Sequence, residues 1–184
     1  MTYVLKLIKL PFALDRVRQT KSKVVYDIGC GSGYGSYLLS YAHDNIQVIG
    51  LDIEPEVVTY AQKVFGNTKT FFSVGDAYKI PARDNSLDMV VCFEVLEHID
   101  NPERAITGFR RLIRRGGHLI FSMPINHPDV IYHKKIYSLE EAKSLIESVR
   151  WSKINYFCQN PDNPFVSKIE KDCKISTLVG ICEK

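Results

Sequence analysis

The sequence has 184 residues, of which 45% are hydrophobic and 24% are charged, and its formal net charge is +3 at pH 7. This length suits one domain with a hydrophobic core. So mild a charge gives no strong indication of a nucleic-acid partner. No apolar run approaches the ~20 residues of a membrane-spanning helix. Five cysteines without a C-x-x-C pair favour reduced thiols and a cytoplasmic protein. They stand at positions 30, 92, 158, 173 and 182.

Residues 1–22 form an apolar and basic flank ahead of a domain that we expect at residues 23–184. Lys6 and Lys9 interrupt what would otherwise be the apolar stretch of a signal peptide, so secretion is not expected. Pro11 is expected to break or kink a helix in this flank. Two roles remain open for it: a helix packed on the domain, or a lid over the site.

A strand, a glycine-rich turn and a helix are predicted between residues 24 and 42. An apolar run at 24–26 leads to Asp27, and glycines follow at 29, 31, 33 and 35. Such a turn lets a ligand lie against bare backbone and directs N–H groups toward it. The dinucleotide spacing G-x-G-x-x-G fails, because its last position falls on Tyr34 or Ser36. The pattern present is D-x-G-x-G-x-G.

A second strand is predicted over residues 46–51, and it leads to Asp52. This acid stands 19 residues after Gly33, near the ~20 expected for a carboxylate that accepts hydrogen bonds from a ribose diol. The alternative is an N-cap for the helix predicted over residues 54–65, which Pro55 would suit. We favour the ribose role, because strand, acid and glycine turn occur together.

Strands and helices alternate through the rest of the chain. This alternation predicts an α/β domain of three layers with a mainly parallel sheet. A helix at 103–115 is expected to be closed by Gly116 and Gly117. A helix at 137–149 is expected to begin with a capping box of Ser138 and Glu141. Further strands are predicted at 70–74, 87–93, 118–123, 151–158 and 175–182, with a loop at 160–165.

The combined motifs resemble the class I S-adenosylmethionine (SAM)-dependent methyltransferases. The motif D-x-G-x-G-x-G, the block L-D-M-V-V-C-F-E-V-L-E-H-I-D-N-P and the stretch R-R-G-G-H-L-I-F-S-M-P carry the resemblance, which covers about residues 23–127. The sequence looks most like the type-11 group, with its ubiquinone-biosynthesis O-methyltransferases and small sugar or antibiotic methyltransferases. The resemblance implies a Rossmann-like sheet of seven strands, one of them antiparallel near an edge.

The resemblance also implies the cofactor and the residues that would bind it. We expect SAM to be bound by the glycine turn and by residues at strand ends. Asp76 and Ala77, after the strand at 70–74, match the positions that face the adenine ring. The expected cofactor-binding residues are Asp27, Gly29, Cys30, Gly31, Gly33, Asp52, Ile53, Asp76, Ala77, Phe93 and Glu94.

The sequence narrows the acceptor of the methyl group. Residues 92–95 do not match the N/D-P-P-Y/F pattern of enzymes that methylate base amines, and no Pro-Cys pair of cytosine C5 enzymes occurs. A small-molecule acceptor, methylated on oxygen, is therefore expected. The alternatives are a protein or RNA acceptor, and a SAM-binding module or related enzyme that transfers no methyl group. Residues 1–20 and 126–133 are expected to select the acceptor.

Glu94, Glu97 and His98 follow the strand at 87–93, where the methyl-bearing end of the cofactor is expected. If Glu94 began a helical turn, the three residues would share one face. His98 would then be the candidate catalytic base, oriented by a carboxylate. The group could instead hold a divalent cation, although no metal site is predicted. In the third interpretation Glu94 contacts the cofactor or a loop N–H, and His98 only packs.

Overall fold

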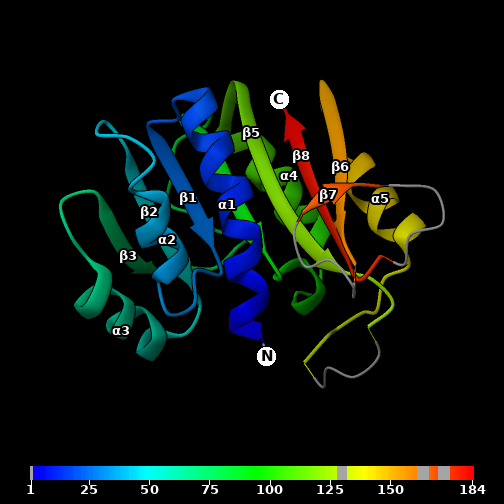
Figure 1. Ribbon diagram of the computed structural model, residues 1–184, viewed down its shortest axis with the longest axis horizontal. Coiled ribbons are helices and arrows are strands. Elements are labelled where there is room, and N and C mark those ends of the chain that lie inside the picture. Colours follow the sequence, from blue (N-terminus) through cyan, green and yellow to red (C-terminus); the bar gives the residue numbers. More distant parts are fainter. Residues whose placement is uncertain (1, 128–131, 161–165, 170–174) are drawn as a thin grey trace.

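The computed structural model describes residues 2–127, 132–160, 166–169 and 175–184, with side chains from residue 9 onward. One mixed β-sheet runs through the molecule, and helices cover both of its faces (Figure 1). No helix in these described ranges is long and apolar enough to cross a membrane. The elements are α1 (Thr2–Thr20), β1 (Val24–Ile28), α2 (Tyr34–Leu39), β2 (Gln47–Asp52), α3 (Pro55–Phe65), β3 (Thr70–Val74), β4 (Leu87–Phe93), the 3₁₀ helix η1 (Leu96–His98), α4 (Pro102–Leu112), β5 (Ile113–Pro124), α5 (Leu139–Glu147), β6 (Lys153–Gln159), β7 (Ser167–Lys168) and β8 (Thr177–Glu183).

The strand order is β3-β2-β1-β4-β5-β8-β6-β7. Strands β1 to β5 are parallel, and β8 lies between β5 and β6, antiparallel to both. The predicted Rossmann-like architecture is confirmed, with one addition. The two-residue strand β7 extends the expected seven strands to eight and is also antiparallel to its neighbour.

Two hydrophobic cores lie on opposite faces of the sheet. In β4, Met89 and Val91 face the core formed with α1 and α2, whereas Val90 and Cys92 face the core formed with α4 and α5. All four side chains are 0–1% exposed. Burial on both faces explains the continuous apolar run that predicted this strand. The three-layer arrangement follows directly from these two cores.

Helix α1 runs past Pro11 without a break. Pro11 is exposed within the helix, while Ala13 and Val17 are fully buried against the sheet. Lys9 lies one turn before Ala13 and is also fully buried. This packing against the sheet outweighs the cost of a proline inside the helix. From Lys9 onward, the flank is therefore part of the layer that covers this face (Figure 1).

The helix predicted at 103–115 ends earlier than expected. Helix α4 ends at Leu112, and Ile113 is already extended at φ −65° and ψ 133°. Ile113 is fully buried and pairs with Leu87 of β4, so it opens β5. Gly116 and Gly117 lie inside this strand and do not close the helix. The arginine-rich sequence suits the exposed side of a helix or of a strand, and pairing with β4 decides between them.

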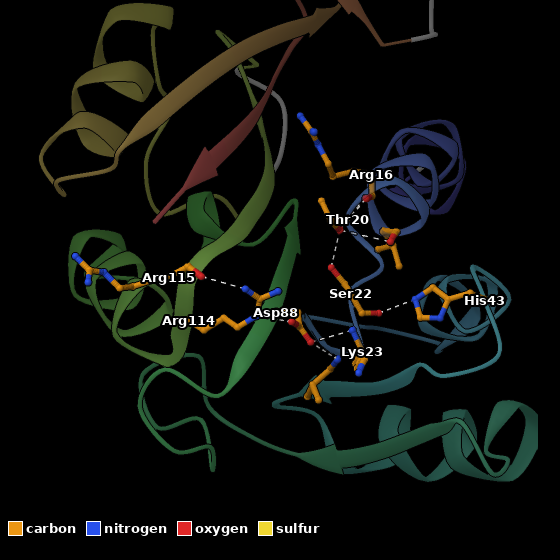
Figure 2. Close-up of polar contacts among 10 residues, drawn as sticks. Arg16, Thr20, Ser22, Lys23, His43, Asp88, Arg114 and Arg115 are labelled. Atoms are coloured by element: carbon orange, nitrogen blue, oxygen red, sulfur yellow. Dashed lines mark hydrogen bonds and ion pairs between the residues drawn. The ribbon is translucent and has the colours of Figure 1, made fainter.

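The amino-terminal ends of β1, β4 and β5 are joined by one carboxylate, that of Asp88 (Figure 2). Its Oδ2 accepts hydrogen bonds from the N–H groups of Lys23 (2.9 Å) and Val24 (2.8 Å), and its Oδ1 accepts one from Nε of Arg114 (2.5 Å). Burial opposes ionisation of Asp88, but these donors outweigh it and hold the pKa of the carboxyl below its ordinary value. At this edge of the sheet, the Asp88 carboxylate therefore has its hydrogen-bond donors and its cationic partner within the protein.

Strand β8 fits against β5 at a glycine. Gly180 pairs with Phe121, and a Cβ at position 180 would lie 2.1 Å from the Phe121 ring. Only a residue without a side chain leaves room for this ring in the core between the sheet and α4. The close approach therefore fixes which residue of β8 can stand opposite Phe121.

Candidate functional site

The predicted site residues gather at the carboxyl ends of β1, β2 and β4. The strand order reverses between β1 and β4, and such switch points leave a crevice at the carboxyl edge of a parallel sheet. The glycine turn after β1, Asp52 at the end of β2, and Glu94 directly after β4 all lie at this edge. Distant parts of the sequence thus meet as expected.

The glycine turn has one open position. Gly29, Gly31 and Gly33 have φ values of +67°, +55° and +85°, which side chains rarely adopt. A Cβ on Gly33 would meet Ala61 and Phe72, whereas a Cβ on Gly31 would have no atom within 4 Å. Gly31 therefore faces open space, where a ligand could lie against the backbone.

The Asp52 carboxylate is hydrogen-bonded to the backbone at this open position. Its Oδ2 accepts a hydrogen bond from the Gly31 N–H (2.8 Å), and its Oδ1 accepts one from the Glu54 N–H (3.2 Å). Within the described residues, no lysine or arginine forms an ion pair with this half-buried carboxylate. The N-cap of α3 is Glu54, so the capping alternative for Asp52 is wrong. The side chain of Ile53 is 65% exposed beside it.

The other predicted cofactor residues have more internal roles. Asp27 is buried, and its Oδ2 accepts a hydrogen bond from the Ser36 hydroxyl (2.6 Å). Cys30 is buried, and its N–H donates to the Leu51 carbonyl (3.0 Å), which joins the turn to β2. Both residues therefore stabilise the glycine turn from the buried side. Phe93 packs in the core that faces α1, so only its backbone would reach a ligand.

Asp76 and Ala77 form a turn after β3. The Asp76 Oδ1 accepts a hydrogen bond from the Tyr78 N–H (2.8 Å), and the Asp76 carbonyl accepts one from the Lys79 N–H (2.8 Å). Both residues are only partly buried. These hydrogen bonds hold the backbone of the turn in place. Because both residues are only partly buried, the turn remains accessible to a ligand.

Glu94 does not share a face with Glu97 and His98. Its φ of +54° is left-handed, and the helical turn begins only at Leu96. The buried Glu94 carboxylate forms an ion pair with Lys9 of α1 and accepts a hydrogen bond from the Ser122 hydroxyl (2.7 Å). The expectation of a single three-residue face is therefore wrong. The left-handed conformation between the strand and the turn takes Glu94 out of the helical turn that carries the other two.

His98 has a defined tautomer. Its Nδ1 lies 3.0 Å from the Tyr132 carbonyl oxygen, which can only accept, so Nδ1 carries the proton of the neutral ring. Nε2 then carries the lone pair of the neutral ring. It lies 3.8 Å from Oε1 of the buried Glu97. The His133 ring packs edge-on against His98 at a centroid distance of 4.9 Å. Burial, and then the neighbouring His98, hold the pKa of His133 below its ordinary value, against the opposing effect of the Glu94 carboxylate.

The family model described as "Methyltransferase domain", of type 11, matches residues 26–121, more than half of the chain. The chain belongs to the family of class I SAM-dependent methyltransferases. A ubiquinone biosynthesis O-methyltransferase of Vibrio cholerae is 32% identical over 118 residues, which cover 62% of the chain and 47% of that protein. One of Hydrogenovibrio crunogenus is 28% identical over 142 residues, 74% of the chain and 58% of that protein. The chain thus spans about half the length of the curated relatives that it matches.

Solved structures agree on the fold of the methyltransferase. A SAM-dependent methyltransferase from Thermotoga maritima superposes with a TM-score of 0.75 at 19% identity, over 99% of the chain and 92% of its own. One from Archaeoglobus fulgidus gives 0.70 at 18% identity, over 95% and 94%. The cofactor of this family is SAM, and the open position at Gly31 with Asp52 fastened beside it fits a nucleoside with a ribose diol.

The methyltransferase also has a group that could hold a metal ion. One ligand atom each of Glu97, His98 and His133 lies within 4.8 Å of the other two. Carboxylate and imidazole are usable ligands for several divalent cations. The sequence predicts a role for His133 only within the acceptor-selecting segment 126–133, of which residues 128–131 lie outside the described residues. No sequence signal placed His133 beside His98, because a loop brings them together.

Lys9 and Ser122 are two further residues that sequence analysis missed. Lys9 stands at helical spacing from Ala13 and Val17, so it lies on the buried face of α1. A lysine on such a face needs a partner of opposite charge. That spacing was the signal for an acidic partner, although it did not say which acid.

Proposed function

We propose that this methyltransferase transfers the methyl group of SAM to an oxygen atom of a small-molecule acceptor. The observation that carries the proposal is the tautomer of His98, whose Nε2 is left to accept a proton from a hydroxyl group. Glu97, 3.8 Å from Nε2, would stabilise the imidazolium that forms. The similarity to ubiquinone biosynthesis O-methyltransferases supports oxygen as the acceptor atom.

We assign the adenosine part of SAM to the side of β2 and β3. Asp52 would accept hydrogen bonds from the ribose hydroxyls, beside the open backbone of Gly31. Asp76 and Ala77 would face the adenine, and Ile53 would cover it. Asp27, Gly29, Cys30 and Gly33 would shape the turn, and the backbone of Phe93 and Glu94 would border the methyl-bearing end. SAM supplies a methyl group already activated by a sulfonium charge, so the protein's main contribution is positioning, worth ~7–11 kcal/mol.

A metal-assisted form of this proposal is supported by a separate observation, the cluster of possible metal ligands. The ligand atoms of Glu97, His98 and His133 are close enough together to bind one divalent cation. Such a cation would polarise an acceptor oxygen and make its proton easier to lose. Both variants favour oxygen as the acceptor, and they differ in their sensitivity to a chelator.

The segment after β5 would select the acceptor. His127 and His133 are half-buried there, and Tyr132 is 78% exposed. The packing of α1 from Lys9 onward supports the role of a packed flank for residues 1–22. A cytoplasmic location remains a prediction from the cysteine content alone.

The deciding experiment uses SAM labelled in its methyl group. The protein is incubated with labelled SAM and with separated small-molecule and macromolecular fractions of a cell extract. We expect label in small molecules, in a bond that resists mild base as an ether does. Label in protein or RNA would contradict a small-molecule acceptor. SAM binding without label in any fraction would instead indicate a binding module.

A further inference from the structure

Lys9 is the one lysine that the described part of the structure buries completely, and it lies at the functional edge of the sheet. Its ammonium group forms an ion pair with Glu94 and donates a hydrogen bond to the Ser122 hydroxyl (3.3 Å). Ser122 in turn donates to the Glu94 carboxylate (2.7 Å) and accepts from the Glu94 N–H (3.2 Å). Three elements, α1, β5 and the end of β4, thus fix one carboxylate.

This ion pair borders the expected methyl-bearing end of SAM. Adenosine is assigned to the β2 and β3 side, so the rest of the cofactor would extend across β1 toward β4. Glu94 follows β4 directly, and the next residue, Val95, packs on the glycine turn: a Cβ on Gly29 would lie 2.4 Å from Val95 Cγ2. Glu94, the partner of Lys9, is therefore the neighbour in sequence of a residue that packs directly on the glycine turn.

The reacting end of the cofactor changes its charge during the reaction. The sulfur of SAM carries a positive charge, and the sulfur of the product S-adenosylhomocysteine (SAH) is neutral. A nearby carboxylate favours SAM, and a nearby ammonium group disfavours it. Charges in a buried setting are weakly screened, so a pair at this place influences the two ligands differently.

We propose that Lys9 is a positioning residue that holds the Glu94 carboxylate and offsets its charge, and that this pair sets how strongly the site prefers SAM over SAH. The proposal rests on the cofactor placement given under the proposed function. Lys9 itself touches neither ligand. It acts through Glu94, and it makes the N-terminal helix a part of the cofactor site.

The test is the ratio of the dissociation constants of SAM and SAH, measured by calorimetry. The two ligands differ in one methyl group and one charge, so general damage to the fold largely cancels in the ratio. We expect Lys9→Met to shift the ratio about tenfold in favour of SAM, because the carboxylate is no longer offset. We expect Glu94→Gln to shift it about tenfold toward SAH. The amide oxygen that this second change introduces can still accept a hydrogen bond from Lys9.

The double variant Lys9→Met/Glu94→Gln removes both charges and should return the ratio to within about twofold of the wild type. Lys9→Arg keeps the charge and should also preserve the ratio. Arg16→Met is the matched control, because it removes a cation from the same helix near His118, toward the other edge of the sheet (Figure 2). It should leave the ratio unchanged.

The proposal is overturned if both ligands bind and both single variants keep the wild-type ratio, or if a shift has the opposite sign or persists in the double variant. Failure of the underlying cofactor placement has a different result. In that case Asp52→Ala would leave the affinity for both SAM and SAH unchanged, whatever the ratio does.

Discussion

The two edges of the sheet use carboxylates in different ways. At the amino-terminal edge, Asp88 binds two backbone N–H groups and the guanidinium of Arg114, which compensates its charge. At the carboxyl-terminal edge, Asp52 also binds two backbone N–H groups. Among the described residues, however, no lysine or arginine pairs with it, and the neighbouring Gly31 faces open space. Asp52 and Asp88 therefore do not differ in the number of backbone N–H groups that they bind. They differ in that Asp52 has no cationic partner among the described residues and lies beside open space.

The largest effect is expected on the rate of methyl transfer, when His98 at the carboxyl-terminal edge is replaced. His98→Gln should lower single-turnover transfer to the identified acceptor at least about 100-fold, the lower range for loss of a general base, with SAM affinity within about twofold. A chelator that leaves wild-type activity intact would favour the base, and one that abolishes it would favour a cation at Glu97, His98 and His133.

The matched control for this variant lies at the other edge. The His43 Nε2 is 2.8 Å from the Ser22 carbonyl oxygen (Figure 2). His43→Gln should leave transfer unchanged. Equal loss of transfer in both histidine variants, or full activity of His98→Gln, would remove the catalytic role of His98.

The next largest effect is expected from filling the open space. Gly31→Val should weaken SAM binding about 100-fold, because its side chain would occupy the ligand's position and the φ of +55° suits no β-branched residue. Gly108→Ala is the control: a Cβ there also meets no atom within 4 Å, but Gly108 lies in α4. Calorimetry with SAM and thermal unfolding separate the two effects. A Gly31→Val protein that is folded and binds SAM normally would contradict the assigned site.

A smaller loss of SAM affinity is expected when Asp52 is replaced. Asp52→Ala should weaken SAM binding by about 2 kcal/mol, roughly 30-fold, through loss of charge-assisted hydrogen bonds to the ribose. Binding of a SAM analogue that lacks both ribose hydroxyl groups, at 2′ and 3′, separates this loss from simple distortion of the turn. Such an analogue should be nearly insensitive to the change. Equal losses for SAM and the analogue would mean that Asp52 only braces Gly31.

The smallest effect on binding is expected from Asp88. Asp88→Asn should leave SAM affinity within about twofold and lower the free energy of unfolding by about 2 kcal/mol at neutral pH. The folded-state pKa lies below the ordinary value of 3.8, so this contribution is complete above that value and is lost as the pH falls through the lower folded-state pKa. In denaturant titrations of both proteins from neutral pH to about pH 3, the difference in the free energy of unfolding should therefore be constant above pH 3.8 and shrink below it. A constant difference across that range would contradict the role of ionised Asp88.

Most of the fold could be predicted because local and long-range signals agree. The strands Thr70–Val74 and Leu87–Phe93 have the predicted bounds, and the capping box of Ser138 and Glu141 is present. The end of α4 was wrong, since pairing of Ile113 with Leu87 is a long-range effect. Pro11 was misleading for the same reason: burial of Ala13 and Val17 keeps the helix continuous.

The candidate site could be predicted only where backbone motifs define it. Glycines and strand-end acids follow from spacing, and the structure brings them to one edge. Side-chain direction after β4 did not follow, because one left-handed residue, Glu94, decides it. The contacts of Lys9 with Glu94 and of His98 with His133 join segments that are distant in sequence, so no local pattern specifies them.

The position of β8 has a consequence for biosynthesis. Strand β8, which lies between β5 and β6, is the last in sequence of the eight strands that the described residues form. A nascent domain therefore presents the long edge of β5 until residues 177–183 leave the ribosome. An exposed edge of this kind can pair with another chain. Gly180 allows insertion in one register only, since any neighbour in its place would collide with Phe121. Completion of the sheet is thus a late and selective step, and translation that stalls before it would yield an aggregation-prone protein.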